Sequence, residues 1–403
     1  MSLMQAPGKT WLEKVSLLGG LCFFLSTLEY MIPKPLPFIR LGLANIPLLL
    51  ALDILPFSYF VLLAALKVAG QALISGTLFS YVFLFSLGGT AVSSLLMYAL
   101  RKCLGKKMIS LVGISAAGAM AFNAVTLVMA YYFVFGKSII YAAAPILALG
   151  IITGTLLGIV CEYFISRSKW YGNSNLQAVN GSLTLPVLEP RGRNAKENFR
   201  AKKFSSLDLA VAGLCMIPAL LFNPDTYMRI VQFLFFFFIA WLSGKKINPL
   251  ITFLVMLAIV FFNLLVPYGE LLFSIGSLKI TYGALMTGLQ RAVTLEGLFM
   301  LSRCCVRSDL AFPGAFGKIA GESLRVFSSL TEARNLFNRK NWVETLDGLL
   351  AGYTQADAGE IKDESERRHS LSGRIILAVL VMLAWLPLFV GRWVLWCVSI
   401  ARR

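Results

Sequence analysis

Six polar or ionisable side chains lie in or beside apolar stretches in the first 123 residues. They are Glu29, Arg40, Asn45, Lys67, Gln71 and Asn123. An ionisable group in hydrocarbon costs several kcal/mol unless it has a partner, so each is a candidate binding residue. Arg40 and Lys67 together favour an anionic or phosphorylated small molecule. The competing interpretation is that Lys67 pairs with Glu29 or extends to the membrane surface, while Gln71 and Asn123 only join helices.

The sequence lacks the motifs of several kinds of catalysis. Gly8-Lys9-Thr10 and Gly136-Lys137-Ser138 both miss the earlier glycine of a phosphate-binding loop. There is no aspartate-rich pair to hold magnesium and a diphosphate, and His369 is the single histidine, which excludes a Ser/His/Asp set. The seven cysteines are scattered without a C-x-x-C pair, as expected of free packing thiols. We therefore expect no enzyme, no metal and no cofactor, with any ATP hydrolysis in partner chains.

The composition places these residues in a membrane protein. The chain has 403 residues, 58% hydrophobic and 14% charged, with a mean hydropathy of +0.75. Apolar segments long enough to cross hydrocarbon as helices recur along it, which predicts an all-α polytopic protein. The net charge of +17 comes from Lys and Arg in loops beside apolar segments, as the positive-inside rule requires, so we expect a lipid membrane and no nucleic acid.

Six helices are predicted in residues 1–166, a domain with both ends in the cytoplasm. Their ranges are 14–32, 41–54, 57–74, 79–100, 109–135 and 139–166, the second being short for a full span. Basic loop residues then fall on one side, which fixes the orientation. Glu29, Arg40 and Asn45 would lie toward the outside, with Lys67, Gln71 and Asn123 near the midplane. We predict that they converge on one outward-opening cavity.

The second half is predicted to be a separate membrane module. Residues 167–203 are polar and basic, which is typical of a cytoplasmic linker near anionic headgroups. Within 204–403, further membrane helices are predicted at 207–222, 227–243, 250–267, 282–301 and 375–398, with amphipathic cytoplasmic helices over about 304–374. A single final span would place Arg402 and Arg403 outside, against the charge rule, so a re-entrant or interfacial segment is the alternative there.

The first domain resembles a known family. The similarity lies in Leu28 to Pro33, Arg40 to Asn45, Ser75 to Ser80, Phe85 to Gly89, Gly118 to Asn123 and Pro145 to Leu147. These motifs are similar to those of the Gx transporter family, named for heptaprenyl diphosphate synthase component I and regarded as a substrate-binding S component of energy-coupling factor (ECF) transporters. The resemblance covers about residues 12–166. The family usually has Arg at the position of Lys67 and His at that of Phe122, which implies a different ligand if these positions contact it.

The second half resembles the T component of ECF transporters, whose cytoplasmic coupling helices dock on paired ATPases. The matching residues are few: Gly276 to Gly283 opening a helix with Arg291, and Glu332-Ala333-Arg334 in the amphipathic stretch. In that family a short Ala-Arg-small motif ends each coupling helix, and its Arg enters an ATPase groove. The resemblance implies ATPase coupling through Arg325, Ala333 and Arg334; the alternative is that Arg334 is an ordinary solvated charge.

These features together predict a fused S and T-like subunit of an ECF-type importer in the bacterial inner membrane. It would bind a vitamin or an isoprenoid or quinone precursor and couple to separate ABC-type ATPase subunits. One alternative is a noncatalytic membrane accessory of a prenyl diphosphate synthase. Another is an ion-coupled secondary transporter that uses Glu29 and Asp53 as proton or sodium sites.

Overall fold

The computed structural model describes residues 7–31, 41–175, 205–244, 247–276, 278–306, 314–332, 342–355 and 371–401. Arg40, Ala333 and Arg334 lie outside these ranges, as do Arg402 and Arg403. The predicted linker is described only at its start, through residue 175.

The first bundle has the predicted helices, with bounds that differ by up to eight residues. They are α1 (Pro7–Met31), η1 (Leu43–Asn45), α2 (Ile46–Ala51), α3 (Phe57–Ser75), α4 (Tyr81–Met108), α5 (Leu111–Ala130), η2 (Tyr131–Phe135), η3 (Gly136–Ser138) and α6 (Ile139–Arg167). The second predicted helix is a 3-10 turn followed by six α-helical residues. The linker range opens with a further short helix, α7 (Lys169–Asn175), in which Trp170 and Tyr171 are buried.

Glycines allow the closest helix contacts of this bundle. On α6, a Cβ added at Gly158 would lie 2.5 Å from the Cα of Val112, and one at Gly154 would lie 2.9 Å from the Cα of Ala116, both on α5. Only a residue without a side chain permits backbones to approach so closely. Small residues therefore set the close approach of α5 and α6.

The described part of the second bundle contains five long helices and a hairpin. The elements are α8 (Ser206–Leu221), α9 (Thr226–Leu242), α10 (Pro249–Leu264), β1 (Leu271–Ile275), β2 (Leu278–Thr281), α11 (Tyr282–Cys305) and α14 (Leu371–Ala401). The antiparallel hairpin β1–β2 was not predicted from the sequence. The final segment is one continuous helix and contains a candidate span, Gly373–Val390. The continuous helix argues against a re-entrant loop, and the interfacial alternative stays a prediction.

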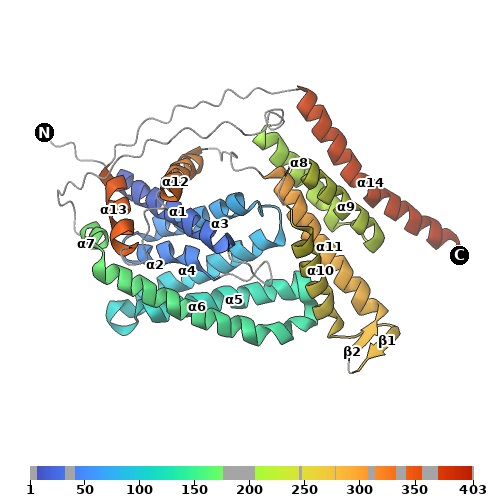
Figure 1. Ribbon diagram of the computed structural model, residues 1–403, viewed down its shortest axis with the longest axis horizontal. Helices are drawn as coiled ribbons and strands as arrows, with labels where there is room; N and C mark the ends of the chain where they lie inside the picture. Colours follow the sequence, from blue (N-terminus) through green and yellow to red (C-terminus); the bar gives the residue numbers. More distant parts are fainter. Residues whose placement is uncertain are drawn as a thin grey trace.

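The molecule is an all-α polytopic membrane protein apart from this hairpin. Among the described residues, five helical stretches are long and apolar enough to cross a membrane, and α8, α9 and α10 are apolar but shorter. In Figure 1 the helices α4, α5 and α6 run across the view, whereas α10, α11 and α14 run steeply down it. Directions that differ in projection differ in space, so the two bundles do not share one helix axis.

Two amphipathic helices of the second half lie on the first bundle. They are α12 (Gly314–Glu332) and α13 (Trp342–Gln355), and they pack against α1 and α7 respectively (Figure 1). Ile319, Leu330 and Leu350 are buried in the same apolar core as residues of α1, α2 and α3. At α7, the backbone N–H groups of Lys169 and Trp170 both donate to Asp347 of α13 at 3.0 Å. The predicted amphipathic helices are therefore present, and their apolar faces are buried within the chain.

Candidate functional site

Five of the six predicted binding residues line one cavity in the first bundle. Glu29, Asn45, Lys67, Gln71 and Asn123 all border it, and the sixth, Arg40, lies outside the described residues. The other lining residues are Leu41, Gly42, Ala44, Met97, Ser115, Gly118, Ala119, Phe122, Gly150, Thr153, Gly154 and Leu157. The walls come from α1, the η1 turn, α3, α4, α5 and α6. The predicted convergence of these side chains is therefore present.

Lys67 is the central cation of this cavity. Its side chain is 4% exposed, and its ammonium donates to Asn45 Oδ1 at 2.5 Å and to Thr90 Oγ1 at 3.2 Å. Asn45 ends the η1 turn, which starts at Gly42 with a φ of 86°, a conformation that favours glycine. The glycine thus turns the chain so that Asn45 meets Lys67. Thr90 on α4 was missed by the sequence analysis, since a threonine in an apolar helix carries no local signal of a partner on α3.

The remaining polar residues each also hold the bundle together. Glu29 is 1% exposed and accepts the backbone N–H of Leu41 at 2.9 Å. Gln71 accepts a hydrogen bond from Ser86 at 3.3 Å. Asn123 on α5 donates to the carbonyl of Ile146 on α6 at 2.9 Å. The interpretation as interhelical hydrogen bonds is therefore correct for Gln71 and Asn123, which also face the cavity.

The cavity is narrow in this conformation. The centre of a water molecule can occupy about 30 Å³ of it, which is room for water, while sites for organic ligands have roughly 300 to 1,000 Å³. Among the side chains at its wall, Phe122 lies against Gly89 and Met97 against Gly118. Both are apolar groups at the wall of the cavity.

Arg325 is the one predicted coupling residue that the structure describes. It is exposed on α12, while Ile319, Ser323, Val326 and Leu330 of the same helix are buried. Arg325 therefore lies off the buried side of α12.

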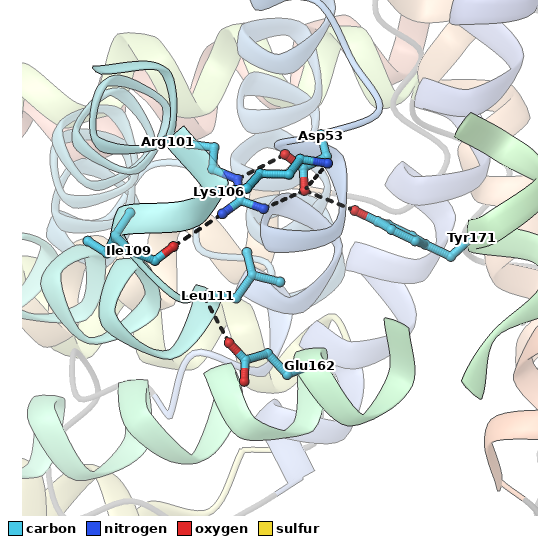
Figure 2. A network of polar contacts seen from close by, with 7 residues as sticks. All are labelled: Asp53, Arg101, Lys106, Ile109, Leu111, Glu162 and Tyr171. Carbon is cyan, nitrogen blue, oxygen red and sulfur yellow. Dashed lines mark hydrogen bonds and ion pairs between the residues drawn. The ribbon is translucent and has the colours of Figure 1, made fainter. Parts of the chain in front are cut away.

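A second polar centre lies at the end of the bundle predicted to face the cytoplasm (Figure 2). Asp53, in the loop between α2 and α3, accepts two hydrogen bonds from Arg101 of α4, at 2.9 Å from Nε and 2.7 Å from Nη2. Lys106 is 3.3 Å from the same carboxylate, and the Tyr171 hydroxyl of α7 donates to it at 3.4 Å. Burial alone would raise the pKa of Asp53, but the hydrogen bond and charge of Arg101, with Lys106, outweigh it and lower that pKa. Asp53 is thus an ion-pair anion at the basic end of the bundle.

A third polar group joins the two bundles. Asn263 of α10 donates to the carbonyl of Val134 in η2 at 3.2 Å, and its side-chain oxygen accepts from Arg291 of α11 at 2.9 Å. The segment η2 is π-helical, a form that leaves a backbone carbonyl without its usual helical partner. Arg291 also packs on Gly136, where an added Cβ would lie 2.7 Å from its guanidinium. The bundles are therefore connected by specific polar contacts.

Comparison with known proteins gives matches for two parts of the chain. Residues 18–164 match the family model described as heptaprenyl diphosphate synthase component I. Residues 208–308 match a model described as a domain of unknown function (DUF8519). No curated protein and no solved structure matches the chain.

Proposed function

Residues 18–164 belong to the heptaprenyl diphosphate synthase component I family, and from this membership we propose that they form the substrate-binding domain of an ECF-type importer. The family fits an S-component-like membrane protein. The second half would be the T-like module that couples this domain to separate ATPase chains. The ligand class we propose is a small anionic molecule, among which a vitamin or an isoprenoid or quinone precursor is expected.

The observation that carries this proposal is the buried cavity around Lys67. Lys67 brings a positive charge to the wall of this cavity, and a positive charge attracts an anion that enters it. Gln71 and Asn123 add amide groups on the other walls. The two positions that depart from the family pattern, Lys67 and Phe122, both line this cavity. The departures therefore lie where they would alter ligand choice.

The contact between α12 and α1 supports coupling within one chain. Ser16 of α1 donates to Glu322 of α12 at 2.8 Å. At Gly19 and Gly20, added Cβ atoms would lie 2.6 Å from Ser323 Oγ and 2.5 Å from Val326 Cβ. ATPases that bind near Arg325 would shift α12 along α1, and this sliding of one helix on the other would reorient the bundle that holds the cavity. Glu29 at the cavity wall is on the same helix α1.

The replacement Lys67→Met tests the site. It keeps the apolar part of the side chain and removes the charge. Mass spectrometry should therefore find that the amount of small molecule bound to the purified protein is reduced about tenfold or more. Lys137→Met, at an exposed turn outside the cavity, is the matched control and should retain it. Equal ligand content in both variants at equal expression would remove Lys67 from the binding site.

The family description favours one further candidate, a membrane accessory of a prenyl diphosphate synthase without catalysis of its own. Co-purification separates the two functions. ATPase chains isolated with the protein would support the importer, and a soluble synthase isolated in their place would support the accessory role.

A further inference from the structure

A second, wider cleft opens beside the Asp53 centre and has no part in the substrate proposal. The centre of a water molecule can occupy about 440 Å³ of it, against about 30 Å³ in the Lys67 cavity. It lies where the start of α1 and the loop from α2 to α3 meet the end of α4. The lining residues that matter for its chemistry are Trp11, Asp53, Tyr98, Arg101, Lys102 and Lys106.

The cleft depends on a break in α4 at Gly105. This residue has φ 70° and ψ 173°, which no helix contains and which side-chain-bearing residues rarely adopt. The break turns the chain so that Lys106, one residue later, returns to within 3.3 Å of Asp53. Arg101 and Lys102, before the break, therefore border the same space as Lys106.

The cleft carries an excess of positive charge. Three cations, Arg101, Lys102 and Lys106, line it with one carboxylate, Asp53. Asp53 accepts two hydrogen bonds from Arg101, and these bonds fix the position of the Arg101 side chain. Lys102 and Lys106 are exposed, and the Lys106 side chain retains 65% of its surface. Their ammonium groups are therefore accessible to an anion in the cleft.

The border of the cleft is apolar and aromatic. Trp11 and Tyr98 line it, and Tyr98 packs on Phe57, with ring centroids 5.1 Å apart. Phe57, Leu104 and Met108, all next to or near lining residues, are 47%, 38% and 79% exposed. Aromatic rings with exposed apolar side chains are typical of the level where headgroups meet acyl chains.

We propose that this cleft binds the phosphate-bearing headgroup of an anionic phospholipid. Lys102 and Lys106 contact the phosphate, Arg101 is positioned by Asp53 at its back, and Phe57, Leu104 and Met108 face the acyl chains. A soluble phosphate shares the charge but gains nothing from the exposed apolar border. This inference does not depend on the identity of the transported molecule.

The test is lipid retention by the full chain in nanodiscs, measured by native mass spectrometry. Wild-type protein should hold phosphatidylglycerol in preference to phosphatidylcholine. The variant Lys102→Gln/Lys106→Gln should bind phosphatidylglycerol about fivefold more weakly per lysine removed, since each lysine near an anionic surface contributes about that factor. The control Lys107→Gln/Lys169→Gln removes the same charge from exposed residues outside the cleft. It should lose far less affinity than the cleft variant, because neither lysine contacts the headgroup held in the cleft.

Two results would overturn the proposal. The first is equal loss of lipid in both double variants, which would mean that only net charge matters. The second is displacement of phosphatidylglycerol by equimolar glycerol 3-phosphate or inorganic phosphate, which would make the ligand a soluble anion. If the lysine variant does not fold, equal retention of the two lipids by wild-type protein decides against the site.

Discussion

Lys67 and Arg101 are both cations within the first bundle, and they are held in different ways. Lys67 faces a cavity and bonds to the neutral oxygens of Asn45 and Thr90. Arg101 donates paired hydrogen bonds to Asp53, and the two side chains are 11% and 8% exposed, respectively. A fork of two parallel hydrogen bonds fixes a guanidinium strongly. Arg101 thus serves structure, while Lys67 borders the cavity in which we propose that a ligand binds.

Replacing Asp53 by Asn should destabilise the protein. The substitution leaves the largely buried Arg101 guanidinium without its carboxylate. Breaking a buried ion pair lowers the free energy of unfolding by several kcal/mol, and for this pair near the surface we expect a loss of roughly 3 kcal/mol. Thermal unfolding in detergent measures the change. Asp208→Asn is the matched control. The side chains of Asp208 and its partner Arg374 are 27% and 51% exposed, so this ion pair should contribute under about 1 kcal/mol to stability. Similar losses in both variants would contradict the assignment of Asp53 as a structural anion.

The same ion pair gives a pH dependence with a fixed sign. The folded-state pKa of Asp53 is below its unfolded value of about 3.9, so the stabilisation is complete above that pH and is lost as pH falls through the folded pKa. The difference in melting temperature between wild type and Asp53→Asn should be constant from about pH 5 to 8 and shrink below about pH 4. A difference that instead disappears near neutral pH would point to another titrating group.

At the residue scale, the sequence reveals polar groups but not always their partners. Lys67, Asn45 and Gln71 stand out because apolar neighbours surround them, and their meeting in one cavity follows from the order of the helices. The pairing of Asp53 with Arg101 joins residues 48 positions apart. No local pattern indicates it, because Asp53 lies in a loop where a charge is ordinary.

At the element scale, the contact of α1 with α12 rests on residues without bulky side chains. A Cβ added at Gly20 would lie 2.5 Å from Val326 Cβ and 2.9 Å from the carbonyl oxygen of Ser323. Because the second neighbour is backbone, it cannot rotate away. The helix α12 can therefore pack here only against a glycine.

The variant Gly20→Val should detach α12 from α1. Overpacking of this kind costs roughly 1 to 3 kcal/mol and should appear as faster proteolysis within α12. Gly321→Ala, on α12 itself, is the control, since an added Cβ there meets nothing within 4 Å and alanine favours a helix by about 0.5 to 1 kcal/mol. Unchanged proteolysis in Gly20→Val would show that the two helices do not depend on this contact.

The long helices are predictable from sequence because an apolar run of sufficient length indicates a span directly. The hairpin β1–β2 is not predictable in this way, since Leu271 to Thr281 is short. Leu271, Leu272 and Phe273 are all exposed, so no alternation of buried and exposed residues marks the first strand. The break at Gly105 is also hidden, because one glycine among basic residues at the end of a helix resembles an ordinary terminus.

At the scale of the whole molecule, the chain is two bundles with different helix directions, and two joints are among the contacts between them (Figure 1). One joint is the polar contact of Asn263 with Val134 and Arg291. The other is the packing of α12 and α13 on α1 and α7. If the proposed importer operates by moving the first bundle, the second joint transmits the force. The two bundles should then need freedom to change their relative orientation during transport.

A reversible crosslink across that joint tests this requirement. A Cβ on Gly19 would lie 3.3 Å from the Cβ of Ser323, close to the roughly 3.5 to 4.5 Å that disulfides span, so Gly19→Cys/Ser323→Cys should form one once the Leu66 side chain shifts. With the exposed Cys103 and Cys215 replaced by Ser, oxidation should stop ATP-driven uptake in vesicles, and dithiothreitol should restore it. The single variant Gly19→Cys controls for crowding at Leu66 and should transport equally under both conditions. Full uptake by the oxidised double variant would mean that α12 and α1 move as one body, and the relative motion would then have to occur at other contacts between the bundles, such as that of Asn263 with Val134.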